Sequence, residues 1–134
     1  MGDRTSCTLY IYGTTTAALW ADVEKALDEF SPDDDGNEEG GYFWFNEVNY
    51  GGLDEDVEAT LIAAGLSYQW QWEQGGGYSE GIKLYDADTK ETAEFCAIDH
   101  EIALPVSLLT SDNIEVARKW AAWIKASKTW EVIG

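Results

Sequence analysis

The sequence SYQWQWE, residues 67–73, alternates strictly between aromatic and polar side chains. Tyr68, Trp70 and Trp72 hold the even positions, and glutamine or glutamate holds the odd positions from 69 to 73. Successive side chains of a β-strand point to opposite faces of its sheet, so this period of two predicts a half-buried strand with an aromatic inner face. The rest of the chain must supply partner strands and a cover for that face.

Two further segments before this stretch are typical of strands. Cys7–Tyr12 (CTLYIY) is rich in β-branched and aromatic residues and ends at Gly13, and Tyr42–Tyr50 (YFWFNEVNY) ends at a glycine pair. After it, Ile82–Tyr85 and Thr92–Ile98 flank a polar hexapeptide that is typical of a hairpin turn. Pro105 interrupts the later apolar segment, which we expect to be an edge strand or a packed loop.

Three segments show the apolar spacing of helices. Thr14, Thr15 and Thr16 can cap the first, whose inner face we predict to be Leu19, Trp20, Val23, Leu27 and Phe30. Asp54 can cap the second, which should bury Val57, Leu61 and Ala64 and end at Gly65. Asp112 and Glu115 form a capping box for the third, with inner positions Ile114, Ala117, Trp120, Ala121 and Ile124.

The predicted element order is β-α-β-α-β-β-β-α. Residues 1–134 show no linker or internal repeat, and a chain of this length suits one domain. We therefore predict a single acidic α+β domain with a mainly antiparallel sheet and with helices packed on one face.

Acidic residues greatly outnumber basic ones, and the excess is concentrated in the first two thirds of the chain. There are 26 acidic and eight basic residues, a net charge of −18, and residues 1–82 alone carry −15. Small soluble domains usually carry a net charge of magnitude about 2–8. Self-repulsion at this density costs the folded state free energy, so we expect a cationic partner. A salt-adapted source or simple solubility is the alternative, although it predicts carboxylates spread evenly along the chain.

Composition also argues against several partners and locations. Phosphate contacts depend on Lys and Arg, so we expect no direct binding to nucleic acid or to an anionic membrane. No run of 18 apolar residues and no signal-peptide pattern is present, and we expect a cytoplasmic location in a host cell. Cys7 and Cys96 lack metal-ligand spacing and should be reduced and buried.

Catalytic and metal-binding motifs are weak. Pro32-Asp33 with Asp88-Thr89-Lys90 matches a loose nuclease pattern, but we place its parts on a loop and a hairpin tip. A calcium loop starting at Asp33 has Glu38 where an EF-hand needs glycine. His100, the single histidine, has no accompanying nucleophile motif. We predict no enzymatic activity, no cofactor and no metal, with a divalent-metal hydrolase as the third hypothesis.

The acidic residues around the second predicted strand form the candidate site. Before it stand Asp33, Asp34, Asp35, Glu38 and Glu39, and after it stand Asp54, Glu55, Asp56 and Glu58. Two clusters at opposite ends of one sheet face could imitate phosphate positions of DNA, which carries one charge per roughly 1.7 Å of axis. Trp44 and Tyr78 are the expected aromatic anchors of the interface.

In composition, this small, acidic, Trp- and Tyr-rich chain resembles phage- or plasmid-encoded inhibitors of host defence. That resemblance implies an anti-CRISPR or anti-restriction protein that mimics DNA and occupies the nucleic-acid groove of a CRISPR effector or restriction enzyme. The competing hypothesis is a non-enzymatic module that binds a protein or ligand through the aromatic sheet face. A homodimer is also possible through the basic face of the last helix, formed by Arg118, Lys119, Lys125 and Lys128.

Overall fold

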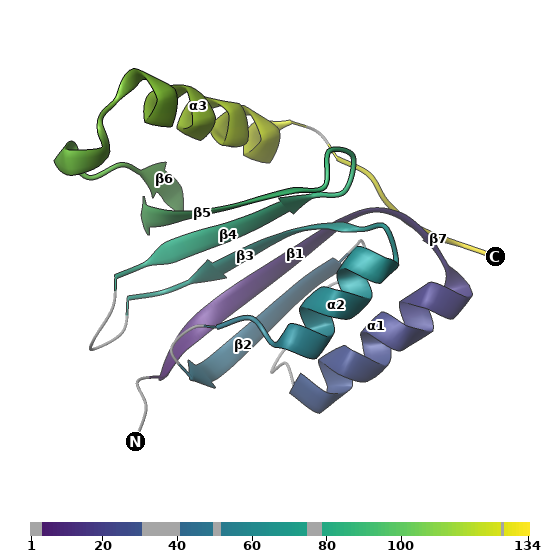
Figure 1. The fold of residues 1–134 in the computed structure, drawn as a ribbon. Coiled ribbons are helices and arrows are strands. Elements are labelled where there is room, and N and C mark those ends of the chain that lie inside the picture. The colour runs from purple at the N-terminus through teal and green to yellow at the C-terminus, as the bar shows by residue number, and fades with distance from the viewer. Residues whose placement is uncertain (1–3, 31–40, 50–51, 75–78, 127) are drawn as a thin grey trace.

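A computed structural model of the chain describes residues 4–30, 41–49, 52–74, 79–126 and 128–134. It contains β1 (Arg4–Thr16), α1 (Ala17–Phe30), β2 (Gly41–Asn49), α2 (Glu55–Ala63), β3 (Ser67–Trp72), β4 (Gly81–Asp86), β5 (Glu91–Ile98), β6 (Glu101–Ala103), the 3₁₀ turn η1 (Val106–Leu108), α3 (Ser111–Lys125) and β7 (Trp130–Ile133) (Figure 1). The α+β class is confirmed.

One sheet connects the strands in the order β2-β1-β3-β4-β5-β6, and every neighbouring pair in this order is antiparallel. This arrangement confirms the mainly antiparallel sheet. β7 adds a parallel pairing, because Trp130–Ile133 lies along the end of β1 from Gly13 to Thr16. The pairing explains why β1 continues through three threonines that we expected only to cap a helix.

The sheet separates two hydrophobic cores. The larger core lies between the sheet and the α1–α2 pair, and its largest members are Leu9, Ile11, Val23, Leu27, Val57, Leu61, Leu66, Tyr68 and Trp70. The smaller core lies between β4, β5 and α3 and contains Ile82, Leu84, Ala97 and Trp120. Alternation along β4 divides its side chains between the two cores, with Tyr85 in the first and Ile82 and Leu84 in the second.

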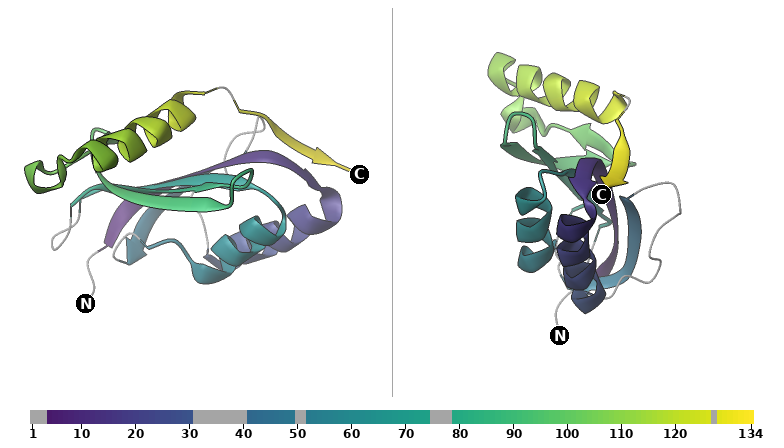
Figure 2. Two further views of the ribbon diagram at one scale, coloured as in Figure 1. Left: turned by 45° about the horizontal axis from the view of Figure 1, so that its top comes forward. Right: turned by 90° about the vertical axis from the view of Figure 1, so that its right-hand side faces the viewer.

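The helix arrangement differs from the prediction in one respect. α1 and α2 share a face of the sheet, as expected, whereas α3 lies across the other face (Figure 2). The physical reason is that Ile82 and Leu84 point away from α1 and α2 and need their own cover. The central position of β3 has a similar effect: Gln69 and Gln71, which we expected to face solvent, are buried between side chains of β1 and β4.

Helix starts follow the predicted chemistry with one shift. Thr16 Oγ1 accepts a hydrogen bond from Leu19 N at 3.3 Å, and Asp54 caps α2 as predicted. α3 begins at Ser111, because Thr110 Oγ1 accepts from Asn113 N at 3.2 Å, so the predicted cap Asp112 lies within the first turn. Leu19, predicted to be in the core, is 38% exposed.

Candidate functional site

α1 and α2 form a strongly acidic layer on one side of the molecule. The two helices lie side by side and run in opposite directions (Figure 1). Together with the cap residue of α2 they carry the carboxylates of Asp22, Glu24, Asp28, Glu29, Asp54, Glu55, Asp56 and Glu58, against the single basic residue Lys25. We call this group of residues the acidic helix layer. Sequence analysis included only its α2 half in the candidate site.

The two helices place their acids in different electrostatic settings. Glu55, Asp56 and Glu58 lie in the first turn of α2, where the helix dipole favours negative charge. Asp28 and Glu29 lie in the last turn of α1, where the dipole disfavours it, and that turn contains no basic residue. The helix dipole therefore favours the acids of α2 and disfavours those that end α1.

Two of the predicted site residues in α2 have structural partners. The Asp54 carboxylate accepts hydrogen bonds from the backbone of Asp56 and Val57 at 3.1 and 3.2 Å, so it caps the helix. Glu58 accepts a hydrogen bond from the Tyr68 hydroxyl and forms an ion pair with Lys83 at 2.8 Å. Glu55 and Asp56 remain exposed to solvent and available to a partner.

The surroundings of Glu58 explain its protonation state. Burial alone would raise its pKa, but the hydrogen bonds from Lys83 and Tyr68, together with the charge of Lys83, lower the pKa below its usual value. Burial and the neighbouring Glu58 both raise the pKa of Tyr68, which therefore stays a neutral donor. Glu58 therefore links α2 to Tyr68 of β3 and Lys83 of β4, and its carboxylate is not free to mimic a phosphate.

The remaining predicted site residues cannot be placed as side chains. Asp33, Asp34, Asp35, Glu38, Glu39 and Tyr78 lie outside the described residues. The backbone of Trp44 lies in β2 opposite Thr8 of β1, and its side chain is outside the described part. Among the described residues, the candidate site therefore consists of the α1 and α2 acids.

Four of the eight basic residues lie in or just after α3, on the opposite side of the sheet. Arg118, Lys119 and Lys125 are exposed, and Lys119 forms an ion pair with Glu91 at 2.7 Å. Lys128 does not lie on an outer face as predicted: its amino group is 4.8 Å from the Tyr12 ring centre and 4.4 Å from that of Trp123. Burial lowers the pKa of Lys128, and the charge of Asp86 opposes that shift.

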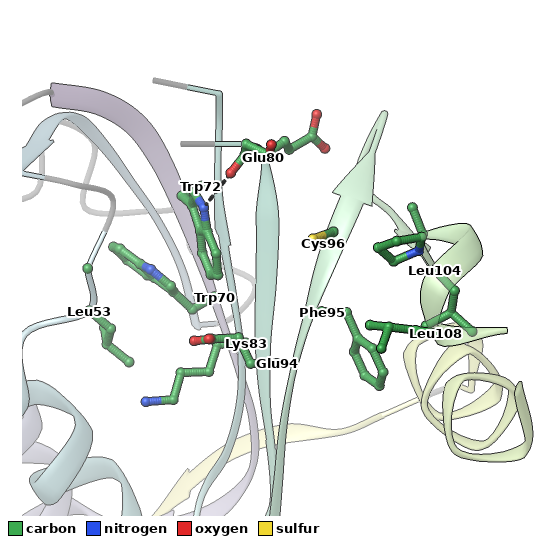
Figure 3. Close-up of a pocket in the computed structure, with 14 residues that line it drawn as sticks. Leu53, Trp70, Trp72, Glu80, Lys83, Glu94, Phe95, Cys96, Leu104 and Leu108 are labelled. Carbon is green, nitrogen blue, oxygen red and sulfur yellow. Dashed lines mark hydrogen bonds between the residues drawn. The ribbon is translucent and has the colours of Figure 1, made fainter. Parts of the chain in front are cut away.

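A cleft of about 860 Å³ opens on the same side of the sheet as α2, beyond the edge of that helix. Its lining includes Trp70 and Trp72 of β3, Lys83 of β4, and Glu94 and Cys96 of β5, while Leu104 and Leu108 form a wall at the sheet edge (Figure 3). We call it the Trp72 cleft. Of the predicted aromatic face, Tyr68 and Trp70 are core residues, so Trp72 is the half-buried aromatic side chain of β3 that reaches this space.

The remaining reactive side chains show no catalytic arrangement among the described residues. His100 lies near Glu73 and Glu80, with nitrogen–oxygen distances of 3.4 and 3.7 Å, and is half exposed. In the described part of the chain, His, Cys, Asp and Glu residues form no group that could hold a metal ion.

Cys7 and Cys96 are both free thiols. Cys7 is buried, as predicted. Its burial and, to a smaller extent, the charge of Glu73 raise its pKa to about 12. Cys96 is exposed, contrary to the prediction.

No protein-family model matches the chain, and no curated protein or solved structure matches it either. Among the described helices, none is long and apolar enough to cross a membrane.

Proposed function

We propose that the protein is an inhibitor that binds a basic, nucleic-acid-binding host-defence complex, such as a CRISPR effector or a restriction enzyme, through a DNA-mimicking acidic surface. The observation that carries the proposal is the charge of the acidic helix layer, in which six exposed carboxylates accompany one lysine. Nucleic-acid grooves are lined with Lys and Arg, so a rigid surface of carboxylates is electrostatically complementary to them.

The two-sided distribution of charge supports the proposal over solubility or salt adaptation. The helices on the two faces of the sheet differ in charge: the acidic helix layer carries eight carboxylates and one lysine, whereas α3 on the other face carries two carboxylates and three basic residues, a difference that solubility does not require. Glu29, in the last turn of α1, also opposes the helix dipole, so the dipole gives no reason for its charge. An orienting field of this kind raises association rates with a cationic groove.

A competition assay tests the proposal. Purified protein is titrated into a CRISPR effector or a restriction enzyme that is bound to fluorescent target DNA, and displacement of the DNA is measured by anisotropy. We expect the protein to displace DNA, to bind the DNA-free enzyme, and to show no affinity for the DNA itself. Simultaneous binding of DNA and saturating protein to the same enzyme would contradict the proposal.

A further inference from the structure

The floor of the Trp72 cleft is rigid and already formed. Trp72 of β3 is paired with Gly81 of β4, and a Cβ atom at position 81 would come within 2.0 Å of the Trp72 ring. The indole N–H donates to the carbonyl oxygen of Ser79 at 3.0 Å, which fixes the orientation of the ring. A preformed aromatic surface needs little ordering when a ligand binds, which lowers the entropic cost of association.

The wall of the cleft is apolar and continues onto exposed apolar surface. Leu104, Pro105 and Leu108 line it at the sheet edge. Val106 and Leu109, next to these residues in the sequence, are 86% and 53% exposed. Exposed large apolar side chains near a cleft of a strongly charged protein are typical of an interaction site.

The charges in the cleft favour a cationic ligand. Glu80 and Glu94 belong to the lining, and Lys83 is the single basic residue among the described lining residues. The Lys83 ammonium is already paired with Glu58 at 2.8 Å and extends towards α2 (Figure 3). Glu94 is exposed and forms no ion pair within the described part of the chain. Glu80 already accepts a hydrogen bond from the backbone N–H of His100 at 2.6 Å. An anionic ligand would therefore be repelled chiefly by the Glu94 carboxylate.

We propose that the Trp72 cleft binds an extended protein segment in which apolar side chains are flanked by Lys or Arg. The apolar side chains pack against Trp72 and against the apolar wall that includes Leu108, and the flanking cations lie against Glu94. Gly52 and Leu53, which lead into α2, line the same cleft, so the site is continuous with the acidic helix layer. The inference rests on the proposed function in one respect, because it assigns the segment to the same basic partner.

A peptide titration followed by NMR tests this site directly. The probe is acetyl-KKLLKK-amide, added to ¹⁵N-labelled protein while the indole N–H signal of Trp72 is monitored; Trp72→Phe identifies that signal. We expect saturable shifts of the Trp72 signal with KKLLKK. EELLEE should not shift it, because its glutamates face Glu94, and KKSSKK should bind more weakly, because it lacks the apolar contact.

Matched variants separate cleft binding from general charge attraction. Leu108→Ser should weaken KKLLKK binding roughly tenfold, whereas Val116→Ser on α3 should change it by less than about twofold. Leu108 and Val116 are equally suitable for substitution, with exposures of 47% and 46%. Glu94→Gln should weaken binding, and Glu115→Gln on α3 should not. Equal binding of KKLLKK and EELLEE, equal effects of the paired variants, or no shift at Trp72 would overturn the proposal.

These experiments distinguish failure of the cleft proposal from failure of the proposed function. Lysine substitutions at Asp22 and Glu24 of α1, outside the cleft, should leave KKLLKK binding at Trp72 intact. Peptide binding without displacement of DNA from defence enzymes would support the cleft and contradict the DNA-mimicry proposal. DNA displacement without a Trp72 response would support DNA mimicry and overturn the cleft.

Discussion

Trp72 and Gly81 illustrate how a single position shapes the surface of a cleft. The Trp72 ring occupies the space that a side chain at position 81 would fill, and its indole N–H is held by Ser79. Glycine inside a strand usually weakens the strand, and it often marks a close approach of another group. Here that group is the aromatic floor of the cleft.

Substituting Gly81 by alanine should destabilise the protein by about 1–3 kcal/mol, because an added methyl group would overlap the Trp72 ring. Urea unfolding measures this change. Trp72→Leu provides the control, since Gly81→Ala in that background should cost much less. Equal costs in the two backgrounds would show that the ring and the glycine are not in contact.

The Glu58 cluster gives a pH-dependent prediction. The pKa of Glu58 is lower in the folded protein than in the unfolded chain, so its stabilisation is present above the unfolded value of about 4.5 and is lost as the pH falls through the folded value. Glu58→Gln should therefore cost about 1–3 kcal/mol at neutral pH. The difference from the parent should shrink as the pH falls below about 4.5. Urea unfolding at a series of pH values measures it, and a difference independent of pH would contradict the assignment.

Contacts between residues far apart in the sequence could not be predicted from the sequence, whereas local patterns could. The alternation at residues 67–73 predicted which side of β3 carries its aromatic side chains, because that pattern is local. It could not predict that Lys83 meets Glu58, since that contact depends on the register between β3 and β4 and on where α2 crosses them. Cys96 lies in an apolar segment, but the strand register places its side chain in the lining of the Trp72 cleft, where it is exposed.

At the scale of elements, strongly periodic segments were predictable and short or context-dependent ones were not. The three helices and the β4–β5 hairpin follow from apolar spacing and turn chemistry. β7 has four residues, and its pairing with β1 is set by the path of the chain after α3. α3 packs on the other face of the sheet because Ile82 and Leu84 form a second core there. No local sequence pattern reveals this second core.

Trp130 should be the residue that holds β7 in place. Its ring meets Trp20 of α1 edge-on, with ring centres 4.6 Å apart. Trp130→Ala should cost about 2 kcal/mol through lost apolar burial and should speed amide exchange at Thr14–Thr16. The exposed neighbour Val132 provides the comparison, since Val132→Ala should cost less than about 0.5 kcal/mol. Unchanged exchange at β1 in Trp130→Ala would contradict this role.

The described helices on the two sides of the sheet differ in charge: the acidic helix layer lies on one side, and α3, with two carboxylates and three exposed bases, lies on the other. The sequence shows the excess of acids in residues 1–82, but it does not show that the acids of α1 and α2 lie in one layer. They do so because the two helices pack side by side over the same core.

Self-repulsion at a net charge of −18 should make the fold more stable in moderate salt. At physiological ionic strength the screening length is about 8 Å, which is short enough to weaken repulsion across the acidic layer. We expect Tm to rise by roughly 3–6 °C between low and physiological NaCl, as a gain of about 1 kcal/mol would give. A flat or falling Tm in calorimetry would show that the carboxylates do not strain the fold.

The central claim is that the position of the negative charge, and not its amount, produces inhibition. The most direct measurement is DNA competition by two triple variants of equal net charge. One carries Asp22→Lys, Glu24→Lys and Glu29→Lys in the acidic helix layer; the other carries Asp88→Lys, Asp112→Lys and Glu115→Lys, at residues that are also exposed but lie outside the layer. We predict that the first loses at least about tenfold in affinity for the defence enzyme and loses much of its salt dependence, while the second competes like the parent. Equal inhibition by both variants, or an equal loss in both, would contradict the claim.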